Sequence, residues 1–209
     1  MSVNAITLAE MTAAVIIEYD RTMGRWEPNA RGRLEQAAME LYIERGFEQT
    51  SVTEIAKRAG LTERTFFRHF ADKREVLFQG ASSLQDFLVS SIAGAQDSAA
   101  PLDAVATALE AAGARLQERR EFSLKRQAVI AAHAGLRERE LIKLAALALA
   151  MAEALRRRGV TDPAATLAAE AGIAVFKVAF ERWINERSQR ELPQLIRESL
   201  DELRAVTAG

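Results

Sequence analysis

The sequence predicts an all-α protein in which a short three-helix domain is followed by a larger helical bundle. Apolar residues recur at helical spacing along most of the 209 residues. Hydrophobic residues make up 49% of the chain, while glycine, proline and aromatic residues are sparse. Between residues 50 and 78, moreover, three helix starts fall within fewer residues than most chains use for two helices.

Composition narrows the class of protein further. The net charge of −1 does not indicate a general polyanion binder, so any nucleic-acid argument depends on where the positive residues lie. The absence of cysteine excludes disulfides and thiolate chemistry. The longest apolar run, Leu144 to Ala152, is shorter than the roughly 18 residues of a membrane helix, and no signal peptide is recognisable. We therefore expect a cytoplasmic protein with no membrane partner.

No nucleotide-binding or metalloprotease motif is present, and the two histidines, His69 and His133, lie far apart in the sequence. A metal cluster or a Ser-His-Asp site is therefore poorly supported. We expect neither an enzyme nor a cofactor.

The first domain is expected to span residues 25–75, after an N-terminal extension at residues 1–24. Met23 directly precedes this domain, so translation starting there and a genuine extension are both compatible with the sequence. Asn29 can cap a helix from Ala30 to Arg45. Gly46 and Phe47 then have the positions of a Schellman-type stop. The buried stripe of this helix is Leu34, Ala37, Ala38, Leu41 and Tyr42.

Two short helices joined by a glycine turn follow. Ser51 and Glu54 have the spacing of a capping box at the start of Val52–Ala59. Gly60 can end this helix in the left-handed conformation, and Thr62 can cap the next one, Glu63–Phe70. Such a pair forms a helix-turn-helix, whose second helix can enter a DNA major groove. Only Phe66 and Phe70 are needed inside, which leaves Glu63, Arg64, Phe67, Arg68 and His69 exposed.

The run GLTERTFFRHFADKREVLF resembles the signature of the tetracycline-repressor (TetR) family of bacterial transcription regulators, and the match covers roughly residues 30 to 78. The resemblance implies that Thr62, Arg64, Thr65 and Phe67 face bases, while His69 and Lys73 hold phosphates. Phe67 stands where the family often has Tyr and can offer only apolar contact. The remaining candidate DNA-binding residues are Arg31, Arg33, Ser51, Thr53 and Arg68. Arg31 and Arg33 lie at a helix start, where two interpretations stand: solvated charge, or contact with DNA.

The second domain is expected to span residues 76–209. A long helix from Asp72 to about Ile92 would join the two domains and transmit changes between them. The further predicted helices begin at Pro101, at Glu121, after a break at Gly135, at Asp162 and at Pro193. The helix from Asp162 is apolar on most of its circumference, so it must be covered on two sides.

The resemblance also implies a homodimer, formed by the last two helices, and a pocket for a small-molecule effector. The candidate dimer residues are Ile173, Phe176, Phe180, Trp183, Ile196, Leu200 and Leu203. The candidate effector residues are Phe87, Phe122, Arg126, Ile130, His133 and Phe176. For Arg126 and His133 a structural interpretation is also open, in which they pair with a carboxylate or reach the DNA-binding domain.

The sequence thus predicts a dimeric, ligand-responsive repressor that binds a near-palindromic double-stranded operator. The alternative hypothesis is a helical small-molecule-binding or protein-interaction module with a non-functional helix-turn-helix. The first hypothesis is favoured by the expected exposure of Arg64, Arg68, His69, Lys73 and Phe67.

Overall fold

A computed structural model of the chain describes residues 29–185 and 190–208. The predicted N-terminal extension, residues 1–24, lies outside this range. Every regular element in the described ranges is a helix, which confirms the all-α prediction. The helices are α2 (Ala30–Arg45), α3 (Val52–Arg58), α4 (Glu63–His69), α5 (Glu75–Phe78), α6 (Ala81–Ala93), α7 (Pro101–Gln117), α8 (Arg120–Ala131), α9 (Ala134–Arg157), α10 (Asp162–Asn185) and α11 (Leu192–Thr207).

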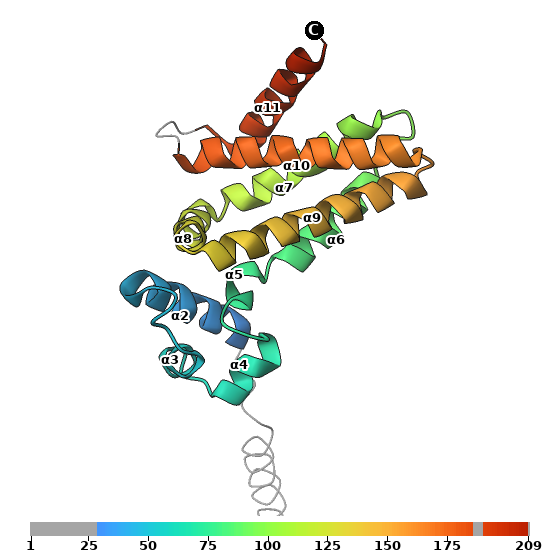
Figure 1. The fold of residues 1–209 in the computed structure, drawn as a ribbon. Helices are drawn as coiled ribbons and strands as arrows, with labels where there is room; N and C mark the ends of the chain where they lie inside the picture. Colours follow the sequence, from blue (N-terminus) through green and yellow to red (C-terminus); the bar gives the residue numbers. More distant parts are fainter. Residues whose placement is uncertain (1–28, 186–189, 209) are drawn as a thin grey trace, which may run out of the picture.

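Two apolar clusters divide the molecule. Helices α2 to α5 enclose one cluster, which forms the smaller part at the bottom of Figure 1. Helices α6, α7, α9, α10 and α11 enclose the other, in the bundle above. Helix α8 lies between them, and its Val129 and Ile130, with Leu136 of α9, belong to the smaller cluster. The two parts therefore share apolar packing through α8.

The smaller part follows the predicted local signals closely. The Ser51 hydroxyl accepts the Glu54 amide and the Glu54 carboxylate accepts the Ser51 amide, which confirms the capping box. Gly46 and Gly60 both have positive φ, at 87° and 66°, as expected at helix ends. The Phe47 ring then packs edge-on to Tyr42 at 5.2 Å between centroids.

The single helix predicted from Asp72 to Ile92 is wrong. The chain turns at Gln79 and Gly80 and divides this stretch into α5 and α6. Three consecutive side chains of α5, Val76, Leu77 and Phe78, are buried in the smaller cluster, whereas α6 packs on the bundle. One straight helix cannot direct three consecutive residues into one core and then face another, so the chain bends. Helix α5 thus belongs with the first domain, three residues beyond the boundary predicted at residue 75.

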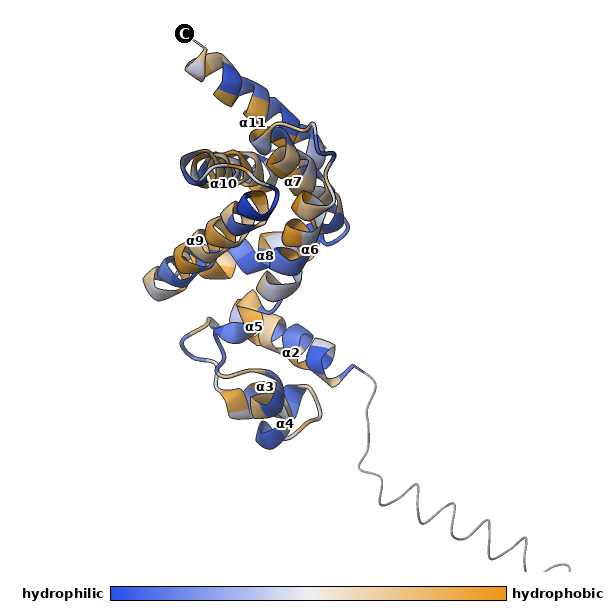
Figure 2. Cartoon of the chain, turned by 90° about the vertical axis from the view of Figure 1, so that its right-hand side faces the viewer, coloured by the Kyte–Doolittle hydropathy of each residue, from blue (hydrophilic) through white to orange (hydrophobic). Residues whose placement is uncertain are grey.

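The bundle has two layers of helices. Helices α9 and α10 form the layer nearest the viewer in Figure 1, with α6 and α7 behind them, and Figure 2 shows the same two layers from the side. Gly172 lets α10 approach α7 closely, since a Cβ there would overlap Val105. The predicted break at Gly135 occurs slightly earlier, at Ala132–His133, so Gly135 lies inside α9. Helix α10 is long and apolar enough to cross a membrane, but it packs on α7, α9 and α11 as a core helix of the bundle.

The structure corrects part of the predicted dimer surface. Ile173, Trp183, Ile196 and Leu200 are buried within the chain, and Trp183 Nε1 donates to Gln117 Oε1 at 2.8 Å. Side chains already covered by their own subunit cannot pack against a second one. These four residues therefore fill the core of one subunit, whereas Phe176, Phe180 and Leu203 are only partly covered.

Candidate nucleic-acid interface

Helix α4 presents an exposed face whose residue types suit contact with DNA. Phe66 is fully buried and Phe70 nearly so, which fixes the helix on the smaller cluster. The opposite face carries Arg64, Arg68 and Phe67, whose side chain is 55% exposed. An aromatic ring exposed to this extent between two cations is unusual for a surface with no partner. This face lies at the end of the molecule farthest from the bundle (Figure 1).

The two arginines of α4 are available to a ligand. Arg64 and Arg68 make no hydrogen bond or ion pair with any other residue that the structure describes. The only carboxylate on α4, Glu63, instead accepts a hydrogen bond from the Thr53 hydroxyl at 2.7 Å. The guanidinium groups are therefore free to contact phosphates or base edges.

The hydroxyl groups near α3 and α4 have structural roles first. Thr62 Oγ1 accepts the Thr65 amide at 3.2 Å, and the two threonine hydroxyls lie 3.1 Å apart. Ser51 caps α3 in the same way, and Thr53 is fixed by Glu63. All of them lie at or near helix N-termini, where backbone amides favour a phosphate. We therefore keep Ser51, Thr53, Thr62 and Thr65 as proposed DNA contacts made from a rigid platform.

His69 has an unused nitrogen beside two positive groups. Its Nε2 is buried and has no hydrogen-bond partner among the described residues. Burial, followed by the charges of Arg68 and Arg31, lowers the pKa of the imidazole. A phosphate bound beside Arg68 and Arg31 would offset these charges, and His69 would reach it after its ring turns outward, so the phosphate contact that the resemblance implies for His69 stays a proposal.

Lys73 does not have the role expected from the sequence. Its ammonium donates to the carbonyls of Phe47, Glu48 and Thr50 at 2.9, 3.2 and 2.9 Å, and lies 4.5 Å from the centre of the Phe47 ring. Since an ammonium has only three N–H groups, all its donors are used within the chain. The prediction that Lys73 holds a phosphate is therefore corrected: it fixes the loop between α2 and α3.

The two arginines at the start of α2 are also engaged. Arg31 donates to Gln79 Oε1 at 2.7 Å and stacks over Phe70, yet its side chain remains exposed. Arg33 donates to the carbonyl of Ala59 at the end of α3. Arg33 therefore joins α2 to α3, while Arg31 keeps an exposed surface that can meet a phosphate.

Four of the predicted effector residues lie elsewhere than in a bundle pocket. Arg126 donates to the carbonyl of Leu77 at 2.6 Å and to Glu140 at 3.1 Å, and stacks on the Phe78 ring. His133 lies 3.8 Å from a Glu48 oxygen and packs on Phe47. These contacts confirm the structural interpretation of both residues. Ile130 is fully buried and Phe122 packs on the same cluster, so neither side chain lines a pocket within the bundle.

The other two predicted effector residues are in the bundle. Phe87 of α6 is half-buried and lies 3.6 Å below the Arg115 guanidinium. Phe176 of α10 stacks with Phe180 at 5.7 Å between ring centres. Both remain candidates, because their aromatic faces border the bundle core.

Several contacts between the two parts were not predicted from the sequence. Glu35 is buried on α2 and pairs with Arg119 at 3.2 Å. Glu75 of α5 binds Arg139 of α9 and lies 3.5 Å from Lys143. The one available signal was Glu35 itself, a carboxylate placed inside an apolar stripe, which requires a partner when buried. Together these ion pairs surround α8 and join the DNA-facing part to the bundle.

Comparisons with known proteins agree with this geometry. Residues 35–79 match the family model of bacterial regulatory proteins of the tetR family, and residues 99–208 match that of the MftR C-terminal domain. The chain is 33% identical over 88 residues to the HTH-type transcriptional regulator TcmR of Streptomyces glaucescens, covering 42% of this chain and 39% of that protein. It is 36% identical over 62 residues to the HTH-type transcriptional activator FasR of Mycolicibacterium smegmatis, covering 30% and 28%. The matched segments thus span well under half of these curated relatives.

Solved structures show the same fold along most of the chain. The repressor FadR of Thermus thermophilus, in complex with lauroyl-CoA, aligns over 83% of this chain and 92% of that one, with a TM-score of 0.52 and 24% identity. SmeT, the repressor of a Stenotrophomonas maltophilia multidrug efflux pump, aligns over 84% and 89%, with a TM-score of 0.58 and 18% identity. At these identities the likeness concerns the fold.

Proposed function

The chain belongs to the TetR family of bacterial regulatory proteins, and from this premise we propose that it is a dimeric, ligand-responsive transcriptional repressor in the cytoplasm. The observation that carries the proposal is the outer face of α4, where Arg64, Phe67 and Arg68 are exposed on a helix held by Phe66 and Phe70. We propose that α4 enters the major groove while α3 and the start of α2 contact the backbone.

Each exposed residue of α4 has a distinct role in this proposal. Arg64, in the first turn, can bind O6 and N7 of a guanine with two parallel hydrogen bonds. Phe67 offers an apolar surface to a thymine methyl group. Arg68 and Arg31 form a positive edge beside His69 that suits phosphates. In this proposal Arg64 and Phe67 of α4 recognise bases, while the neighbouring positive side chains position the protein on the DNA backbone.

We propose that the bundle binds the effector, which is largely apolar. FadR is described as a complex with lauroyl-CoA, and SmeT has been solved with triclosan. In the present chain Phe87 and Phe176 are the partly covered aromatic side chains that we assign to such a ligand.

Helix α8 is the element through which the bundle would influence α4. The Arg126 side chain of α8 donates a hydrogen bond to the carbonyl of Leu77 in α5. Ile130 of α8 is buried in the smaller cluster. A ligand that displaces α8 therefore also displaces α5, and with it the domain that carries α4. The effector needs to bind the displaced state better than the DNA-bound state, and a coupling of about 1–3 kcal/mol is typical.

We propose that the two subunits meet on the last two helices, α10 and α11, where Phe176, Phe180 and Leu203 are only partly covered, and that the contact extends along α10 onto the neighbouring α9. Five large apolar side chains are strongly exposed on α9 and α10: Leu141, Ile142, Leu149, Leu167 and Val178. The apolar colouring of both helices is visible in Figure 2. A surface of this kind on a soluble protein favours burial against a second copy. Such a dimer would place two α4 helices on half-sites about 34–36 Å apart.

Fluorescence anisotropy tests DNA recognition directly. The purified chain is titrated with its own upstream DNA and with scrambled DNA, at two salt concentrations. We expect a preference for the upstream fragment that persists at the higher salt concentration, because base contacts depend less on salt than phosphate contacts do. If binding is equal and salt-sensitive, a selection of bound genomic fragments decides between an operator elsewhere and a helix-turn-helix that no longer reads sequence. Recovery of no enriched fragment would favour the alternative of a helical binding module.

The dimer surface is tested separately. Leu149→Glu places a charge in the middle of the exposed apolar face and should convert a dimer into monomers in light-scattering chromatography. Ile43→Glu, at another exposed apolar residue, on α2, is the matched control and should leave the oligomeric state unchanged. If the Leu149→Glu variant is still a dimer, the interface does not include this face of α9.

A further inference from the structure

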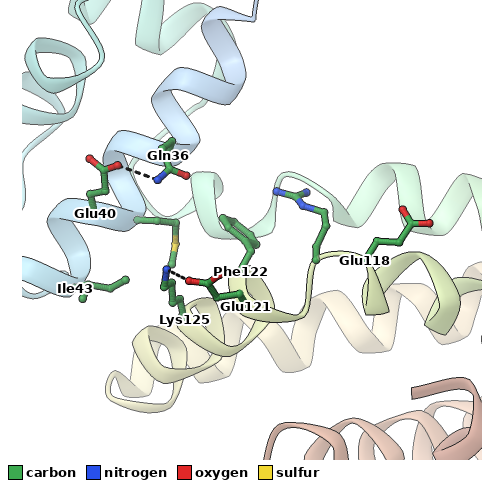
Figure 3. A pocket seen from close by; sticks show the side chains of 9 residues that line it. Gln36, Glu40, Ile43, Glu118, Glu121, Phe122 and Lys125 are labelled. Atoms are coloured by element: carbon green, nitrogen blue, oxygen red, sulfur yellow. Dashed lines mark hydrogen bonds and ion pairs between the residues drawn. The ribbon is translucent and has the colours of Figure 1, made fainter. Parts of the chain in front are cut away.

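A groove lies between the DNA-facing part and the bundle, outside the proposed effector site. It has a volume of about 410 Å³ and is formed by α2 on one side and by the end of α7 and α8 on the other. Figure 3 shows Gln36, Glu40 and Ile43 entering from α2, opposite Glu121, Phe122 and Lys125 of α8. This volume is within the range of small-molecule sites in proteins.

The floor of the groove is apolar. Met39 is buried beneath it, the Phe122 ring forms one wall, and Ile43 contributes a side chain that is 53% exposed. Ile43 is one of only three strongly exposed large apolar residues in the described chain outside α9 and α10. Its exposure at this point would be relieved by an apolar occupant.

The charged side chains around the groove indicate whether a bound molecule should be positively or negatively charged. Arg119 is already bound to the buried carboxylate of Glu35 and covers one face of Phe122, at 4.5 Å from the ring centre. Lys125 is paired with Glu121 at 2.6 Å. The Glu118 carboxylate makes no hydrogen bond or ion pair with any other described residue. Both cations are therefore engaged, and an uncompensated carboxylate remains at the rim.

We propose that this groove is a second small-molecule site, which binds cations that carry a bulky apolar group. The apolar part would lie on Ile43, Met39 and Phe122, while the positive centre would lie near Glu118. An occupant would touch α2 and α8 at once and so contact both parts of the molecule. The site is separate from the bundle residues Phe87 and Phe176.

The test uses two rigid probes of the same shape and opposite charge, tetraphenylphosphonium and tetraphenylborate. Isothermal titration calorimetry of the full chain without DNA should show the cation binding at least about tenfold more tightly than the anion, because the rim carboxylate attracts one and repels the other. Equal binding of the two probes would overturn the proposal. Because no DNA is present, this result is independent of operator recognition.

Four variants locate the bound cation. Glu118→Gln should weaken tetraphenylphosphonium by about two- to fivefold, the range of exposed charge interactions, and Glu121→Gln should weaken it as well, because it releases Lys125 from its ion pair. Ile43→Ser should weaken both probes, and its exposed position makes misfolding an improbable cause. Glu138→Gln, which removes an exposed carboxylate of α9 outside the groove, should change nothing. Cation binding that is unchanged in all groove variants would place the probe elsewhere and refute the site.

Discussion

Replacing Lys73 with Met separates a loop-fixing role from a phosphate-binding role. The ammonium makes three hydrogen bonds to backbone carbonyls between Phe47 and Thr50, and hydrogen bonds to a charged group contribute about 1.5–3 kcal/mol each. The three contributions do not add, because one ammonium makes all of them and water can reach the exposed Glu48 carbonyl. We therefore expect a loss of about 2–4 kcal/mol of unfolding free energy, or about 5–15 °C in Tm.

Two assays on the same variant decide the question. Thermal unfolding measures the stability, and anisotropy measures DNA affinity against salt at a temperature where both proteins are folded. If Lys73 only fixes the loop, the salt slope of the variant equals that of the parent chain. A lost phosphate contact would instead lower the slope by about 0.9 for each subunit, or about 1.8 for a dimer. An unchanged Tm together with a reduced slope would refute the reasoning from the three carbonyl contacts.

Four further predictions concern other parts of the site. Arg64→Ala should cost about 1–3 kcal/mol on the operator and little on random DNA, with unchanged unfolding, which anisotropy on both DNAs and a urea titration would check. A phosphate at His69 would raise its lowered pKa, so DNA binding should take up a proton and tighten as pH falls through the pKa of the DNA-bound imidazole; His69→Gln should remove this dependence in anisotropy measured between about pH 5 and 8. Gly80→Ala should stabilise the chain by about 0.4–1 kcal/mol in urea, because φ is −76° and no atom lies within 4 Å of the added Cβ; a loss of stability would show that the bend needs glycine. Arg126→Met should destabilise the chain by about 1–3 kcal/mol, because Glu140 and the Leu77 carbonyl lose their donor, and an unchanged urea midpoint would contradict this role.

The smaller part was predictable because its signals are local. Capping at Ser51 and Thr62 and the positive φ of Gly46 and Gly60 each depend on residues within one turn of the chain. The same signals predicted that Phe67 would be exposed, since Phe66 and Phe70 suffice to anchor a two-turn helix.

The predictions that were wrong or left open concern contacts between residues that lie far apart in the sequence. The destination of the Lys73 ammonium depends on a loop more than twenty residues earlier in the chain. Arg126 was ambiguous until the carbonyl of Leu77 and the carboxylate of Glu140 were placed beside it. Apolar spacing likewise shows that α10 must be covered on two sides, but it does not show that Trp183 faces its own subunit and Leu167 faces outward.

Helix α8 and the helix-turn-helix share one apolar cluster. This limits how the DNA-binding part can be exchanged for that of another protein. A chimaera cut at Gly80 would leave Val129, Ile130 and Leu136 with the bundle and strip them from the cluster they complete. The graft would expose apolar surface on both halves, and a foreign α8 would have to match the contours of α2 and α5. Exchange of DNA specificity is therefore better achieved by substituting the outer face of α4 within the intact chain than by transplanting the first eighty residues.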